Sequence, residues 1–299
     1  MISLKQLQAF TSIARYGNLS TAANELFLSK GALSQSLAQL ERQLGQVLFD
    51  RVHPRLQLNE QGRQLQPLAE EILSRVMDVE HLFAEQGTPT GSLRLGASQT
   101  IGNYVLPAIL AQQPQLHKVQ ITHTQALCEK ILRFELDLAL VEGEHFPPPL
   151  ISQDWLTDEL LVVANPQHEL FKRYGEQLVT TPLKLAQLAN QAWVLRERES
   201  GIRQQFEQQL APKLAPLGQV LELNTIESIM QAAEHGLGLA FVSRRAAGER
   251  ISTGRLKVVP LDRMLSRTFK LVWHKQKYHS ASLSHFIELC LQHMNKPLP

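Results

Sequence analysis

The sequence predicts an α/β protein with a small helical head and a larger C-terminal part in which strands and helices alternate. Three observations support this prediction. The 299 residues exceed one ordinary domain of about 150 residues, residues 4–44 show the apolar spacing of helices, and residues 92–274 alternate between short apolar strands and helical segments. Hydrophobic residues make up 43% of the chain and charged residues 19%, which excludes disordered and fibrous proteins.

The head is predicted to contain a helix-turn-helix. Apolar residues spaced as on one helical face run from Leu4 to Ala14, and Gly17 follows at a position where helix C-termini favour glycine. Ser20 and Ser29 stand where the N-caps of two further helices would lie, with a short turn between those helices. Helix, short turn and helix is the arrangement of many DNA-binding motifs.

Residues 46–58 predict a β-hairpin wing with a basic turn, and Asn59 is placed to cap a long helix that reaches about Glu85. Pro67 should kink this helix or mark its start. The apolar residues of the helix have the spacing of a helix-pairing seam, although a helix packed on its own domain is the alternative. These residues are Leu65, Ala69, Ile72, Val76, Val79 and Phe83.

Residues 87–91 contain two glycines and a proline and read as a linker. Beyond it, the pattern predicts a strand at 92–97 and a helix at about 101–112, and later strands at 159–164 and 268–274. Such alternation favours a largely parallel sheet. Basic residues exceed acidic ones in residues 1–66, whereas acidic residues dominate residues 67–90. A basic head is a weak sign of nucleic-acid binding.

Several strings of residues resemble the LysR-type transcriptional regulators. In the head these are Leu4-x-x-Leu7-x-x-Phe10, Asn18-Leu19-Ser20-x-Ala22-Ala23, Ser29-x-x-Ala32-Leu33-Ser34, and Leu40-Glu41-x-x-Leu44-Gly45-x-x-Leu48-Phe49-x-Arg51. In the C-terminal part they are Leu93-Arg94-Leu95-Gly96-Ala97-Ser98, Leu136-Asp137-Leu138, Ser200-Gly201-Ile202-Arg203 and Gly236-Leu237-Gly238-Leu239. The resemblance covers nearly the whole chain.

The resemblance implies a winged helix-turn-helix DNA-binding domain at 1–60, a linker and dimerisation helix at 61–87, a hinge at 88–91, and an effector-binding domain at 92–299. It further implies that this last domain has the two-lobed α/β fold of periplasmic binding proteins (type 2). The expected function is sequence-specific regulation of transcription, modulated by a small effector.

The third helix of the head is the expected recognition helix, whose first turns enter the major groove. Lys30 and Gln35 can read base edges, Ser29 and Ser34 can contact phosphates or bases, and Gln39 is a further candidate on the same face.

The wing is expected to place three basic side chains over phosphates or the minor groove, namely Arg51, His53 and Arg55. Arg51 could instead pair with the neighbouring Asp50. Gly31 departs from the small polar residue that is usual at its position in the family.

The expected partners are double-stranded DNA with an interrupted dyad operator, a small effector, and a second copy of the chain in a homodimer or homotetramer. The expected dimerisation residues are Leu65, Ile72, Val76, Val79 and Phe83. RNA polymerase is a further candidate partner, and no membrane is expected.

The effector is expected to be anionic, because two stretches offer hydroxyl and amide groups where helices begin. These stretches contain Ser98, Gln99, Thr100 and Ser200, with the charge of Arg203 beside them and Thr225 at the rim. The alternative for Arg203 is an ion pair with Glu197 or Glu199 and no contact with a ligand.

An enzyme is the main rival class, but G-x-S-x-G, H-E-x-x-H and Walker-type motifs are missing from the sequence. The scattered histidines and two distant cysteines, Cys128 and Cys290, predict neither a metal site nor a disulfide, and no cofactor is expected. A transporter's solute-binding protein is the second rival, and the basic head and the lack of a signal sequence disfavour it. We therefore expect a cytoplasmic location.

Overall fold

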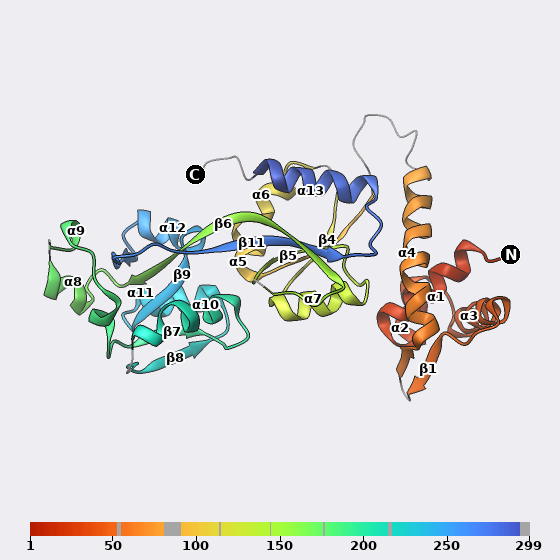
Figure 1. Ribbon diagram of the computed structural model, residues 1–299, viewed down its shortest axis with the longest axis horizontal. Coiled ribbons are helices and arrows are strands. Elements are labelled where there is room, and N and C mark those ends of the chain that lie inside the picture. Colours follow the sequence, from red (N-terminus) through yellow and green to blue (C-terminus); the bar gives the residue numbers. More distant parts are fainter. Residues whose placement is uncertain are drawn as a thin grey trace.

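The computed structural model describes residues 1–52, 55–80, 91–113, 115–143, 145–175, 177–214 and 217–293. Figure 1 shows three parts along the long axis: a head at the N-terminal end, a long helix beside it, and an elongated two-lobed domain. The expected turn residue His53, the seam residue Phe83 and most of the linker lie outside the described residues.

The head is three short helices and a hairpin. Its elements are α1 (Leu4–Tyr16), α2 (Leu19–Glu25), α3 (Lys30–Leu44), β1 (Phe49–Val52) and β2 (Arg55–Leu58), followed by α4 (Glu60–Glu80). The two strands pair antiparallel from Phe49 opposite Leu58 to Val52 opposite Arg55, which confirms the predicted wing.

Helix caps set the boundaries of the head helices. Ser29 Oγ accepts a hydrogen bond from the Ala32 amide at the start of α3, as its N-cap position predicts. The prediction that Ser20 caps α2 is wrong. Asn18 takes this position, because its Oδ1 accepts from the Thr21 amide and α2 therefore begins at Leu19.

The core of the head comes from one face of each helix. Leu7, Phe10 and Ile13 of α1 pack with Leu33 and its neighbours on α3, and all are at most 8% exposed. Ala69 of α4 is also fully buried in this cluster. The first half of α4 is therefore part of the head.

Pro67 is not the start of α4. The helix begins at Glu60, because Asn59 Oδ1 accepts from the Gly62 amide at 2.9 Å while Asn59 Nδ2 donates to the Val47 carbonyl at 2.8 Å. Gly62 is required here, since a Cβ at this position would lie 2.2 Å from the Leu48 carbonyl oxygen. The close approach joins α4 to the base of the wing.

The two-lobed domain divides its elements between the lobes. Lobe I contains β3 (Arg94–Ala97), α5 (Gln99–Tyr104), α6 (Leu106–Leu110), β4 (Lys118–Ile121), α7 (Thr124–Leu132), β5 (Leu138–Glu142) and α13 (Ala281–His293). Lobe II contains α8 (Glu169–Tyr174), α9 (Gln177–Thr180), β7 (Trp193–Arg196), α10 (Gly201–Gln209), β8 (Val220–Leu223), α11 (Ile226–Glu234), β9 (Leu239–Ser243), α12 (Arg244–Ser252) and β10 (Lys257–Val258). Two short 3₁₀ turns, η1 (Leu185–Leu188) and η2 (Ala211–Lys213), complete lobe II.

Two long antiparallel strands, β6 (Leu150–Ala164) and β11 (Leu265–His274), run through both lobes (Figure 1). Within the described residues, nine strands form one sheet in the order β4-β3-β5-β11-β6-β9-β7-β8, with β10 beside β6. The expectation of a largely parallel sheet is correct only inside each lobe. The β5–β11, β11–β6 and β6–β9 pairs are antiparallel.

Three predicted boundaries were also wrong. Strand β6 begins at Leu150 rather than 159, and β11 at Leu265 rather than 268. The helix predicted over 101–112 is two helices. Helix α5 ends at Tyr104, with Val105 as its C-cap, and α6 has Pro107 in its first turn, where the missing amide of proline is tolerated.

The sheet is covered on both faces. In β5, Leu138 and Leu140 join the cluster under α13, whereas Ala139 and Val141 join the cluster under α7. Figure 1 shows α13 and α7 on opposite sides of the lobe I strands. The apolar run from Leu138 to Val141 follows from burial on both faces.

Candidate DNA-binding surface and effector cavity

Helix α3 separates a buried face from an exposed one. Leu33, Leu37 and Leu40 are buried in the head core, with exposures of 0%, 8% and 0%. The side chains expected to contact DNA lie on the exposed part of α3 and at its cap: Ser29, Lys30, Ser34, Gln35 and Gln39. Within the described residues, no ion pair or side-chain hydrogen bond engages Lys30 or Gln35. Both side chains are therefore available to a ligand.

The wing extends this surface. Arg55 opens β2 and is exposed, and Arg51 lies in β1 opposite Leu56. The Leu56 amide donates to the Gly17 carbonyl at 2.8 Å, which fixes the hairpin against the end of α1. The wing and α3 therefore belong to one rigid head.

The turn before α3 holds an exposed aromatic residue that the sequence analysis did not single out. Phe27 is 96% exposed and has a φ of +55°, a left-handed conformation that is costly for a side chain of this size. Leu28 beside it is 45% exposed.

The seam residues of α4 do not all face the same way. Leu65 packs against the head core and Val76 lines a cavity toward lobe I, whereas Ile72 and Val79 are 43% and 68% exposed. Leu68, which the predicted seam omitted, is 57% exposed. Leu68, Ile72 and Val79, spaced four and seven residues apart, form the exposed apolar stripe of α4.

A small cavity of about 120 Å³ lies between the two lobes. Residues of both lobes line it: Ser98, Gln99, Thr100, Ile121, Thr122, His123, Thr124 and Glu142 from lobe I, and Arg196, Glu197, Ser200, Gly201 and Ile202 from lobe II. The structure thus brings together four of the six residues expected to bind the effector: Ser98, Gln99, Thr100 and Ser200.

Three helices begin at this cavity. Ser98, His123 and Ser200 are the N-cap residues of α5, α7 and α10, and none of the three side chains caps its helix with a hydrogen bond. By contrast, Thr225 and Ser243 do cap α11 and α12. The backbone N–H groups of an uncapped first turn attract negative charge.

The charged side chains of the cavity already have partners. The Glu142 carboxylate accepts from Ser98 Oγ at 3.0 Å and is paired with Arg267 Nη1 at 2.5 Å. Arg196, only 5% exposed, donates to both carboxylate oxygens of Glu197, at 2.7 and 2.6 Å. With these charges neutralised, the uncapped helix termini and hydroxyl groups remain to bind a ligand.

Arg203 and Thr225 do not line this cavity. Arg203 donates to the Arg196 carbonyl at 2.8 Å and pairs with Glu207 at 2.6 Å and Glu222 at 3.3 Å. Its partners are therefore not Glu197 or Glu199, the two considered from the sequence. Thr225 Oγ1 accepts from the Ser228 amide as the cap of α11.

Two family models match the chain. Residues 4–63 match the "Bacterial regulatory helix-turn-helix protein, lysR family" and residues 86–295 match the "LysR substrate binding domain". The chain belongs to the LysR family. LysR proteins are transcriptional regulators that combine a DNA-binding head with an effector-binding domain, so the predicted fold class and general function are confirmed.

The similarity extends over the full length of LysR relatives. The HTH-type transcriptional regulator YeiE of Escherichia coli is 38% identical, with 97% of each chain covered. A full-length OxyR variant from Pseudomonas aeruginosa has a TM-score of 0.74 at 19% identity, covering 98% of this chain and 95% of that one. The CcmR regulatory domain of Synechocystis, solved in complex with 2-PG, has a TM-score of 0.62 at 22% identity, covering 69% of this chain and 99% of that domain.

Several residues that line this cavity were not predicted from the sequence, above all Glu142, Arg196 and His123. A signal was present, because Glu142 and Arg196 close strands β5 and β7, and the carboxyl ends of parallel strands form the ligand crevice of such sheets. No helix of the described residues is both long and apolar enough to cross a membrane.

Proposed function

We propose that two heads of a homodimer, or of a homotetramer, bind an interrupted dyad operator in the cytoplasm, and that a small anion between the lobes alters this binding. Ser29, Lys30, Ser34, Gln35, Gln39, Arg51, His53 and Arg55 would contact DNA. The exposed stripe of α4 would join the subunits, and RNA polymerase is a further candidate partner. The protein acts in this proposal as a regulator without catalytic activity.

The observation that supports the anion is the convergence of helix N-termini on one cavity. Helices α7 and α10 each have nine residues, and their first turns point unpaired N–H groups at the space between the lobes. Ser200 adds a hydroxyl group at its wall, whereas the Ser98 hydroxyl already donates to Glu142. A carboxylate or oxyanion accepts hydrogen bonds from such N–H and hydroxyl donors.

The size of the cavity limits the ligand. Its volume of about 120 Å³ is below the ~300–1,000 Å³ of clefts that hold drug-sized ligands. An inorganic oxyanion or a short carboxylate fits this space without opening the lobes. The 2-PG complex of the CcmR domain supports a small ligand in this fold.

The test is isothermal titration of the full-length protein with sulfate, phosphate, acetate and other short carboxylates. We expect at least one of these anions to bind, and Ser200→Ala to weaken its binding by about tenfold, the loss of one charge-assisted hydrogen bond. Ser228→Ala, at a half-buried serine outside the cavity, is the matched control. An unchanged affinity in Ser200→Ala, or no binding by any anion of the panel, would contradict the proposed site.

A further inference from the structure

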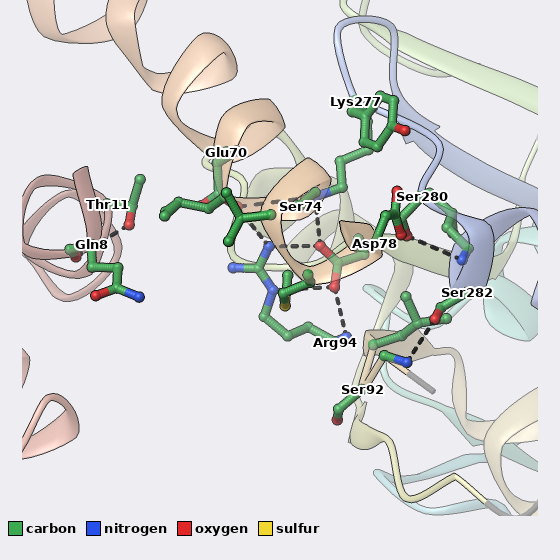
Figure 2. A pocket seen from close by; sticks show the side chains of 18 of the residues that line it. Gln8, Thr11, Glu70, Ser74, Asp78, Ser92, Arg94, Lys277, Ser280 and Ser282 are labelled. Carbon is green, nitrogen blue, oxygen red and sulfur yellow. Dashed lines mark hydrogen bonds and ion pairs between the residues drawn. The ribbon is translucent and has the colours of Figure 1, made fainter. Parts of the chain in front are cut away.

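A cluster of charged side chains lies where the head, α4 and lobe I meet. Glu70 of α4 pairs with Arg15 of α1 at 3.5 Å and with Arg94 of β3 at 3.1 Å. Arg94 also pairs with Asp137 at 2.6 Å, and Asp137 with Lys277 at 2.7 Å. Figure 2 shows Arg94 and Lys277 reaching Glu70 from the side of lobe I. One carboxylate thus connects the DNA-binding head to the effector domain.

The innermost side chains of the cluster are buried. Those of Glu70, Asp137 and Lys277 are 9%, 8% and 6% exposed, and that of Arg94 is 18% exposed. The two acids and two bases of this group balance in charge. Removing one member therefore leaves an uncompensated charge away from water, which is far costlier than breaking an exposed pair.

Other contacts between α4 and lobe I are polar as well. Gln66 Nε2 donates to the Arg133 carbonyl at 2.7 Å, the Ala281 amide donates to Asp78 at 3.3 Å, and the Arg75 guanidinium lies 4.4 Å from the Tyr278 ring centre. None of the hydrophobic clusters of the described residues joins the head to lobe I. A cavity of about 880 Å³ lies beside the contacts instead. We call this junction, which is held by polar contacts rather than by a shared apolar core, the joint.

Two strands of lobe I lead from this joint to the effector cavity. β3 begins at Arg94 and is followed by Ser98, and β5 is preceded by Asp137 and ends at Glu142. The strands pair in parallel, and they span about 13 Å at ~3.3 Å per residue. At the joint the Arg94 amide donates to Asp137 Oδ2 at 2.7 Å, and at the cavity Ser98 Oγ donates to Glu142.

We propose that Glu70 is a positioning residue, which holds the head at a fixed angle to lobe I, and that β3 and β5 transmit changes at the effector cavity to this joint. The inference rests on the proposed function for its biological meaning. The joint itself is a property of the chain with or without DNA.

Hydrogen exchange of the full-length protein tests the joint. We expect Glu70→Gln to make the amide of Ala281, which hydrogen-bonds across the junction to Asp78 of α4, exchange about tenfold faster. Glu60→Gln is the matched control, because Glu60 lies on the same helix, away from lobe I, and among the described residues its ion-pair partner is the exposed Arg63. Equal exchange rates at the junction in the two variants would contradict the proposed role of Glu70 at the joint. Arg94→Gln, which removes the lobe I partner of Glu70, gives the same test if Glu70→Gln fails to fold.

A change at the cavity tests the transmission. A Cβ at position 201 would lie 2.4 Å from Glu142 Oε2, so Gly201→Ala displaces this carboxylate without adding charge. We expect altered exchange at the Arg94 and Asp137 amides, at the far ends of β3 and β5. Altered exchange confined to the cavity would overturn the transmission.

Binding to DNA is a second measurement, which distinguishes a role of Glu70 in positioning the head from a role in folding. Glu70→Gln should keep the wild-type affinity for one half-site but lose the preference for one half-site spacing, whereas Glu60→Gln should keep both. An unchanged spacing preference would overturn the positioning role. If the wild-type protein bound no DNA, the proposed function would fail while hydrogen exchange still decided the joint.

Discussion

At the scale of single residues, the proposed DNA recognition depends on side chains that have no partner among the described residues of the head. Lys30 and Gln35 lie on the exposed side of α3, while the leucines of the same helix fill the core. The fold therefore does not need these two polar side chains. Their substitution should change binding with little effect on stability.

We predict that Lys30→Ala and Gln35→Ala each weaken operator binding by about 1–3 kcal/mol, as loss of a base contact does. Gln43→Ala, an exposed glutamine in the last turn of α3, is the control. Fluorescence anisotropy with a labelled operator measures the affinities. Wild-type affinity in both test variants would contradict the assignment of α3 as the recognition helix.

Asp137 gives a prediction about pH. Burial alone would raise the pKa of its carboxyl, but the charges of Lys277 and Arg94 outweigh burial and hold that pKa well below its usual value. The unfolded chain therefore takes up this proton at a higher pH than the folded chain. The contribution of Asp137 to stability is complete above about pH 3.9 and is lost as the pH falls through the lower folded pKa.

The free energy of unfolding of wild type and Asp137→Asn, measured between about pH 6 and pH 2, checks this prediction. The difference between the two proteins should be constant near neutral pH and shrink at the acidic end. A difference that stays the same down to the lowest pH would show that the carboxylate is not held by its ion pairs.

At the scale of elements, α4 has two different faces, one packed in the head and one exposed to solvent. Ala69 and Leu65 join the head, whereas Leu68, Ile72 and Val79 present an apolar stripe to solvent. Such a stripe is unfavourable in an isolated subunit and favourable in a helix pair.

We predict that Ile72→Glu shifts the protein toward monomers and thereby weakens binding to a two-site operator much more than binding to one half-site. Gln64→Glu adds the same charge at an exposed polar position of α4 and should leave assembly unchanged. Sedimentation velocity gives the distribution of species. Wild-type assembly of Ile72→Glu would show that the subunits join through another surface.

The local patterns of the sequence predicted the head better than the effector domain. Caps, helical spacing and the hairpin of the head depend on neighbours in sequence, so α1, α3 and the wing were predictable. The long strands β6 and β11 were cut short, because polar residues such as the half-buried Gln153 and the exposed Asp154 interrupt the apolar pattern of β6 inside lobe I. Pairing between residues 150 and 274 depends on the whole fold, and a local pattern does not contain it.

The same limit applies to the effector cavity. Ser98 and Ser200 were predictable from strand-to-helix junctions, but Arg203 was assigned to the cavity because of its charge alone. Its guanidinium turns toward Glu207 and Glu222 instead. The sequence places a residue on an element, whereas the direction of its side chain depends on packing between elements.

At the scale of the whole molecule, the DNA-binding surface and the effector cavity lie in different parts of the chain, and α4 stands between them (Figure 1). Sequence-specific DNA binding by the head is the property on which the other proposals depend. The most direct measurement is a salt-titrated binding assay of the full-length protein on the intergenic DNA beside its own gene, with competitor DNA.

We expect a specific complex that survives competitor DNA. The logarithm of its binding constant should fall linearly with the logarithm of the salt concentration, with a slope of about −0.9 for each phosphate contact. Such a complex would also supply the operator for the variants above. A folded protein that binds no DNA at low salt, or binds every sequence equally while bound to its anion, would contradict specific binding by the head.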